Sequence, residues 1–235
     1  LHRLIRRQRQ MCIRDRDILP KTLNEKELKN NKKLSDKEVR NRIVNESLLA
    51  AVNSKPSPLY NKESGITGLI KEAKKDLEAL QTAKFDAIMF GNENDRPYQL
   101  TVDTASTAAA AYIIGELKKD IQIPFGVDML WDPIATIALG AATKANFVRE
   151  IFTGTYSSDM GIWAPDAGKA LRYRKNLGSE EMLLFFNISA EFAYSQDRRS
   201  LSDRARSVVF SSLPDAILVS GQITCLLYTS DAADE

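Results

Sequence analysis

The sequence is poor in the side chains on which much nucleophilic and metal chemistry depends. It has one histidine, His2, and two cysteines, Cys12 and Cys225, which lie near opposite ends of its 235 residues. Neither cysteine belongs to a CxxC pair or another metal-ligand spacing. The body of the chain therefore holds no Ser-His-Asp or Cys-His centre, no His-ligated zinc site and no disulfide framework.

Long hydrophobic runs are also lacking. No apolar stretch approaches the roughly 20 residues that a membrane-spanning helix needs. The Arg-rich first 16 residues lack the apolar segment and the cleavage site of a secretory signal. With 43% hydrophobic and 27% charged residues, the composition is that of a globular domain with one sizeable core. We therefore expect a cytoplasmic protein with no integral membrane segment.

Both ends of the sequence look foreign to the rest. Residues 11–16 (MCIRDR) and 225–235 (CLLYTSDAADE) resemble translated sequencing-adapter read-through. Removing residues 1–16 takes away six Arg and one Asp, and removing 224–235 takes away two Asp and one Glu, so the formal net charge falls from +2 to zero. A nucleic-acid partner would depend on the Arg-rich start, and we expect none.

The chain divides into an N-terminal extension, a main part and a tail. Residues 1–46 are expected to form a largely disordered or helical extension, of which 1–16 are artefactual, and 224–235 an artefactual tail. From residue 47 to 223, short apolar runs alternate with helical stretches, the pattern of βαβ units and a parallel sheet. Strands are predicted at 48–53, 85–90, 124–130, 147–152, 182–188 and 216–220, and helices at 65–83, 104–119, from Pro133 onward, 165–177 and 200–211.

The same pattern fits a doubly wound open sheet or a barrel. Neither the GxGxxG fingerprint nor the GxxxxGK[ST] loop occurs, so nothing supports a nucleotide-binding open sheet. We therefore predict an α/β fold of the (β/α)8 TIM-barrel type. A complete barrel takes about 250 residues, and this one is expected to be truncated after about six strands.

In both parallel architectures the active site lies beyond the carboxyl ends of the strands. Without His or Cys, and with no lysine at a strand end except Lys55, carboxylate acid/base chemistry is what remains. The candidate acid/base residues are Glu93, Asp95 and Asp128, and the candidate ligand-binding residues are Asn94, Arg149, Asn187, Asp159 and Ser220. Such an oxygen-rich pocket also suits Mg²⁺, which leaves that cofactor open.

Each of these residues also has a purely structural interpretation. The loop at 91–97 (GNENDRP) can instead be a set of turn formers and caps, an alternative that stays open, and Asp132 is interpreted as a helix cap alone. Arg149 and Glu150 are adjacent in a strand and so face opposite ways, which buries at least one charge. A structural ion pair of Arg149 with a carboxylate such as Asp128 is the alternative to a functional role there. Hydroxyls and backbone amides at 153–158 are a weaker indication of a phosphate site.

Five segments resemble the BtpA family, also called the SgcQ-like or photosystem I biogenesis family. They are FDAIMFGNENDRPY (85–98), PFGVDMLWDP (124–133), FVREIFTGTYSSDMGIWAPDAG (147–168), LRYRKNLG (171–178) and DAILVSGQIT (215–224). The resemblance implies a TIM barrel similar to ribulose-phosphate-binding barrels, with a phosphate site on the late strands. The family's first strand reads MVHL before a Pro-Gly loop, whereas this chain has Asn53 in place of the histidine.

Two functional hypotheses follow from the residues and the resemblance. The first is an enzyme that binds a small polar, phosphorylated, sugar-type metabolite and uses carboxylate acid/base chemistry. The alternative is a non-catalytic assembly factor of the photosystem I biogenesis type, peripheral to a membrane, which requires an exposed apolar or basic patch. The expected partner is a small-molecule ligand, and a homo-oligomer is left open.

Overall fold

Strands and helices alternate along the part of the chain that the computed structural model describes, residues 46–49, 62–83, 85–93 and 95–220. The strands of the main sheet are β1 (Glu46–Leu49), β2 (Ala87–Gly91), β3 (Phe125–Asp128), β4 (Phe147–Glu150), β7 (Leu183–Asn187) and β9 (Ala216–Leu218). The helices are α4 (Gly65–Thr82), α5 (Thr104–Leu117) with a 3-10 turn η1 (Lys118–Asp120), α6 (Pro133–Thr143), α7 (Ala167–Asn176) and α8 (Leu201–Ser212).

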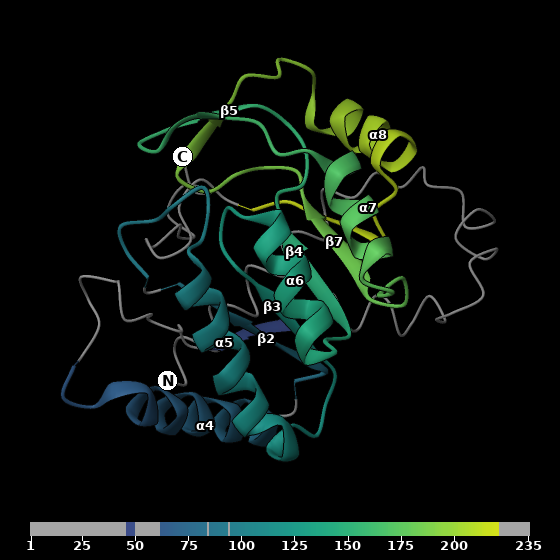
Figure 1. Cartoon of the computed structure of the whole chain (residues 1–235). Helices are drawn as coiled ribbons and strands as arrows, with labels where there is room; N and C mark the ends of the chain where they lie inside the picture. The colour runs from purple at the N-terminus through teal and green to yellow at the C-terminus, as the bar shows by residue number, and fades with distance from the viewer. Residues whose placement is uncertain (1–45, 50–61, 84, 94, 221–235) are drawn as a thin grey trace, which may run out of the picture.

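The main sheet has six parallel strands that pair in chain order, β1-β2-β3-β4-β7-β9. The helices that connect them lie along one face of the sheet (Figure 1). An open doubly wound sheet reverses its strand order and carries helices on both faces. This mixed α/β arrangement is instead consistent with a partial barrel.

Alternation along the strands gives the sheet two different faces. Ile88, Val148 and Phe186 belong to the large hydrophobic core that joins the sheet to the helices. The neighbouring positions form a second, smaller apolar layer on the opposite side, which we call the inner face: Ala87, Met89, Phe147 and Phe185, with Leu183, Ala216 and Leu218 packed against them. The rings of Phe147 and Phe185 stack there with centroids 4.8 Å apart.

Local signals place the helices where the sequence predicts them. Asp132 caps α6 by accepting hydrogen bonds from the backbone N–H of Ile134 and Ala135, both at 3.0 Å, and Pro133 occupies the first helical position. Gly178 follows α7 with φ +62°, as expected of a residue that ends a helix. The buried side of α4 carries Ala73 and Leu77 at helical spacing. Among the described helices, none combines the length and the apolar character needed to cross a membrane.

The structure adds a second sheet to the expected elements. The first predicted strand, 48–53, overlaps β1 at residues 48 and 49, and its remainder lies outside the described residues. Two segments interpreted as loops contain three short strands, β5 (Tyr156–Ser158), β6 (Gly161–Trp163) and β8 (Ala193–Ser195). They pair antiparallel in the order β6-β5-β8. The N-terminal extension up to residue 45 and the two adapter-like segments also lie outside the described residues.

The packing of the inner face around Gly126 of β3 leads to a test. A methyl group added to Gly126 would overlap the ring of Phe147, whereas one added to exposed Gly115 of α5 meets nothing. We expect Gly126→Ala to lower the free energy of unfolding by about 1–3 kcal/mol through overpacking. Gly115→Ala should raise it by up to about 1 kcal/mol, since alanine is the better helix former. Urea denaturation of both variants checks this, and equal effects would contradict the packing of the inner face.

Candidate functional site

Polar side chains replace apolar ones where the parallel strands end. Along the inner face, the step from Gly126 leads to Asp128, from Phe147 to Arg149 and from Phe185 to Asn187, since alternate residues share a face. Asp128 and Asn187 are buried, and the side chain of Arg149 is 25% exposed. The apolar inner layer is therefore followed, toward the carboxyl ends, by a layer of ionisable and amide groups.

Arg149 is the cation of this group. Its Nη2 donates a hydrogen bond to Oγ of Ser220 at 3.1 Å and forms an ion pair with Oε1 of Glu191 at 3.8 Å. The side chain of Glu191 is 13% exposed. Burial raises the pKa of Glu191, while the charge of Arg149 and a hydrogen bond with Ser220 oppose the rise.

Ser220 and Asn187 hold the ends of β7 and β9 together. Asn187 Nδ2 donates to Oγ of Ser220 at 2.6 Å. The hydroxyl of Ser189 donates to the backbone oxygen of Ser220 at 2.9 Å and accepts from its backbone N–H at 2.7 Å. Because these bonds fix Ser220, they also fix the hydroxyl that accepts the Arg149 hydrogen bond.

Glu93 lies in the loop after β2 and is partly buried. Desolvation raises its pKa to about 7, and the negative charges of Glu191 and Asp128 add to the rise. The charges of Arg149 and Arg96 oppose it. A carboxyl group that titrates near neutral pH can both accept and donate a proton at that pH, which is what a general acid/base requires.

Glu150 faces the helix side of β4 and turns its carboxyl group toward the strand ends. It is 3% exposed, and its carboxylate oxygens accept hydrogen bonds from the backbone N–H of Trp131 at 2.8 Å and of Ile151 at 2.5 Å. Burial raises the pKa of Glu150 to about 7, and hydrogen bonds with the Asp128 side chain and with these two amides oppose the rise. Asp128 and Glu150 thus form a buried carboxyl pair, and a hydrogen bond between two carboxyl groups requires a shared proton.

The structure places some of the predicted site residues together and others apart. Asp128, Arg149, Asn187 and Ser220 come together at the strand ends, with Glu93 close enough for its pKa to respond to two of them. Asp95 is partly buried in the turn after β2, and Asn94 lies outside the described residues. Asp159 is exposed in the turn between β5 and β6, on the small sheet rather than at a strand end of the main sheet.

The candidate residues chosen from the sequence did not include Glu150 and Glu191, which belong to the strand-end group. Arg149 forms an ion pair with Glu191, which was not among the candidates, and Asp128 forms a hydrogen bond with Glu150. The expected ion pair of Arg149 with Asp128 stays a prediction. Glu191 follows β7 by four residues, and a polar residue so close to a strand end was the available signal. Among the described residues, no group of three or more His, Cys, Asp or Glu side chains is arranged to hold a metal ion.

Fold and site together define an α/β protein with a parallel sheet in chain order and ionisable groups gathered at the carboxyl ends of its strands. The model of the BtpA family matches residues 44–232, and the chain belongs to the BtpA family. Three relatives illustrate its range. SgcQ, a protein of the sgc region of Escherichia coli (strain K12), is 45% identical over 164 residues, which cover 70% of this chain and 61% of that relative.

An uncharacterized protein of Thermococcus kodakarensis is 31% identical over 182 residues, 75% of this chain and 68% of its own length. The photosystem I biogenesis protein BtpA of Synechocystis is 26% identical over 181 residues, 75% of this chain and 63% of its own length. The chain thus spans less than two thirds of the SgcQ and Synechocystis relatives. No solved structure matches it.

Removing the Glu150 carboxylate tests its structural role. We expect Glu150→Ala to lower the free energy of unfolding by about 3–5 kcal/mol, because the buried N–H groups of Trp131 and Ile151 lose their acceptor. Glu150→Gln keeps one acceptor oxygen and should cost about half as much. Exposed Glu116 of α5 is the control, and Glu116→Ala should change stability by less than about 0.5 kcal/mol. A small effect of Glu150→Ala in urea denaturation would contradict the assigned bonds.

The raised pKa of Glu93 predicts a pH dependence of stability. The folded state holds the proton up to pH about 7 and the unfolded state only to about 4.5, so stability falls as pH rises through this window. Glu93→Gln removes that loss. Relative to the wild type, we expect the variant to gain about 1–3 kcal/mol between pH 4.5 and 8, measured by urea denaturation at both pH values. Glu116→Gln should leave the dependence of stability on pH unchanged. If the stability of Glu93→Gln depended on pH in the same way as that of the wild type, the pKa of Glu93 would be ordinary.

Proposed function

We propose that the strand-end group binds a small polar, phosphorylated, sugar-type metabolite and moves a proton on it with Glu93. The observation that carries this proposal is the pKa of Glu93, raised to about 7 beside Arg149. A group of this kind matches the requirement for acid/base work near neutral pH. The proposal places the protein in the cytoplasm, in agreement with its sequence.

Each polar side chain has a role in this proposal. Glu93 accepts a proton from the ligand and returns it. Burial, aided by the negative charges of Glu191 and Asp128, keeps its pKa near neutral. Arg149 offers a guanidinium to an oxyanion of the ligand, and Asn187 and Ser220 offer amide and hydroxyl groups to its oxygens. Asp95 remains a proposed second acid/base residue, and Asn94 and Asp159 remain proposed ligand contacts.

The proposed setting is a (β/α)8 barrel of which this chain supplies six strands. The chain-order parallel sheet and the helices on one face support this. In such barrels the carboxyl ends of the strands form the active face. The full barrel, the ligand and the reaction belong to the whole protein, of which this chain matches 61% in SgcQ.

A second candidate function is assembly without catalysis, supported by two observations. One relative is named for photosystem I biogenesis. This reading requires an exposed apolar patch, and Val209, Phe210 and Leu213 at the end of α8 are 41%, 88% and 66% exposed. If the protein acts in assembly, Phe210→Ser should abolish binding to the assembly partner, whereas substitution of Glu93 should leave that binding intact.

Ligand screening by thermal denaturation tests the first candidate. We expect a sugar phosphate from a metabolite panel to raise the melting temperature of the full chain in a saturable manner. Arg149→Gln should weaken that binding at least tenfold, because the oxyanion loses its charged donor. Arg172 is exposed on α7, so Arg172→Gln removes the same charge away from the site, and this variant should bind the ligand like the wild type. If no compound of the panel raised the melting temperature in a saturable manner, the assembly function would be favoured.

A further inference from the structure

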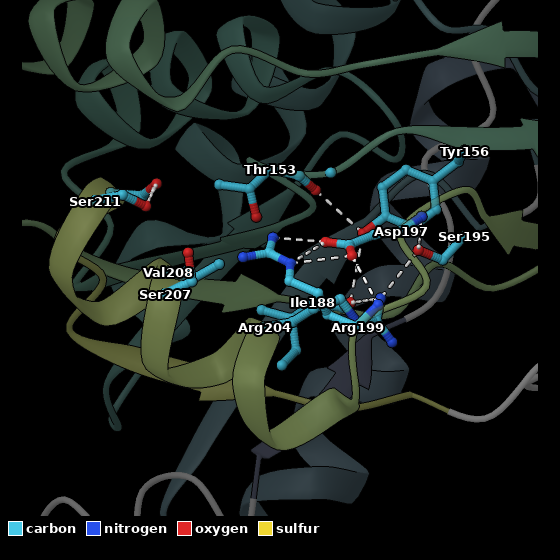
Figure 2. Close-up of a pocket in the computed structure, with 12 residues that line it drawn as sticks. Thr153, Tyr156, Ile188, Ser195, Asp197, Arg199, Arg204, Ser207, Val208 and Ser211 are labelled. Carbon is cyan, nitrogen blue, oxygen red and sulfur yellow. Dashed lines mark hydrogen bonds and ion pairs between the residues drawn. The ribbon is translucent and has the colours of Figure 1, made fainter.

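A polar cavity lies between α8 and the loop after β4, and we call it the α8 pocket. Its volume is about 110 Å³, several times the roughly 30 Å³ that one water takes up in the liquid. It is well below the roughly 300–1,000 Å³ of sites that enclose a drug-sized ligand. The lining residues are Thr153, Gly154, Tyr156, Ile188, Ser195, Asp197, Arg199, Arg204, Ser207, Val208, Ser211 and Ser212 (Figure 2). Its size fits one compact group.

Hydroxyl groups dominate the lining of the α8 pocket. Thr153 contributes one from the loop after β4 and Ser195 one from β8, and Ser207, Ser211 and Ser212 contribute three from α8 (Figure 2). The Ser207 hydroxyl has no hydrogen bond among the described residues. Hydroxyls converging from three elements are suited to the oxygens of a compact polar ligand.

Arg204 gives the pocket its positive charge. Its Nη1 donates to the backbone oxygen of Ile188 at 3.2 Å and to Oγ of Ser195 at 3.1 Å, which holds the guanidinium in place. Its Nε is buried without a hydrogen-bond partner among the described residues. Because the surrounding protein encloses this Nε atom, the guanidinium charge as a whole, rather than this atom, would attract a bound anion.

The one carboxylate in the lining is already neutralised. Asp197 receives hydrogen bonds from Nε of Arg199 at 3.0 Å and from Nη2 at 2.6 Å. These bonds lower the pKa of Asp197 to about 2, so it stays ionised and paired at neutral pH. Two guanidinium groups and one carboxylate leave a net charge of +1 on the lining side chains.

The α8 pocket is separate from the strand-end group. Glu93, Arg149 and Asn187 do not line it. Tyr156 belongs to the pocket lining, where its hydroxyl donates to the backbone oxygen of Thr153 at 3.1 Å and its ring stacks on Trp163 at 4.7 Å. Occupation of one site therefore does not require occupation of the other.

We propose that the α8 pocket binds a tetrahedral oxyanion, the phosphoryl group of inorganic phosphate or of a phosphomonoester. Arg204 supplies the charge-assisted donor and Thr153, Ser207 and Ser211 supply hydroxyl donors around it. A fixed guanidinium with neighbouring hydroxyls is the donor set that phosphate recognition uses. The small cavity volume favours a single phosphoryl group over a larger anion.

Calorimetric titration of the full chain with inorganic phosphate tests the proposal, with chloride at equal ionic strength as the reference. We expect saturable binding that Ser207→Asp weakens at least tenfold, because a carboxylate then faces Arg204 inside the pocket. Ser207→Ala, which removes one hydroxyl without adding charge, should weaken binding severalfold. The same titration with glycerol phosphate distinguishes the two sources of the phosphoryl group, and tighter binding of either supports the pocket.

Two control variants locate the binding. Ser202→Asp adds the same carboxylate to α8 outside the pocket lining, and it should bind phosphate like the wild type. Arg149→Gln disables the proposed metabolite site and should also leave this phosphate binding unchanged, which separates the two proposals. Equal affinity in Ser207→Asp and Ser202→Asp would place the anion elsewhere and overturn the proposal, as would the absence of binding in excess of chloride.

Discussion

The alternation of side chains along β4 is the constraint on which the rest of the structure depends. Phe147 and Arg149 share the inner face, while Val148 and Glu150 share the helix side. A shift of one residue would exchange the two sets and bury the arginine against the helices. Stacking of Phe147 on Phe185 and the close approach of Gly126 to Phe147 hold the register that brings Arg149 to the strand ends.

Charge balance at the strand ends follows from that register. Arg149 lies among carboxyl groups that include Glu93, Asp128 and Glu191, and the charge of Arg96 also acts on Glu93. Because buried charges need partners, a surplus of carboxyl groups leads to retained protons rather than to more ions. Burial raises the pKa of both Glu93 and Glu150 to about 7, and for Glu93 the negative charges of Glu191 and Asp128 add to the rise, so the site responds to pH near neutrality. Stability and proposed chemistry are therefore linked through the same protons.

Parts of this arrangement could be predicted from sequence and parts could not. Asp132 with Pro133 predicts the start of α6, and the apolar spacing of Ala73 and Leu77 predicts α4, because these signals are local. The three strands of the small sheet escaped prediction, since each has three residues and no apolar alternation long enough to recognise. Their pairing joins β5 to β8 across α7 and β7, a contact that only the folded chain brings about.

The sequence by itself determined the alternation of strands and helices, the parallel class of the sheet and the location of polar residues at strand ends. These follow from periodicity and from turn and cap residues, which act within a few positions. Only the tertiary structure decided that Arg149 pairs with Glu191, that Asp128 and Glu150 share a hydrogen bond, and that Arg204 lines a separate pocket. Ion-pair choice, desolvation and cavity shape depend on distances between strands and helices far apart in the chain, and no local pattern encodes those distances.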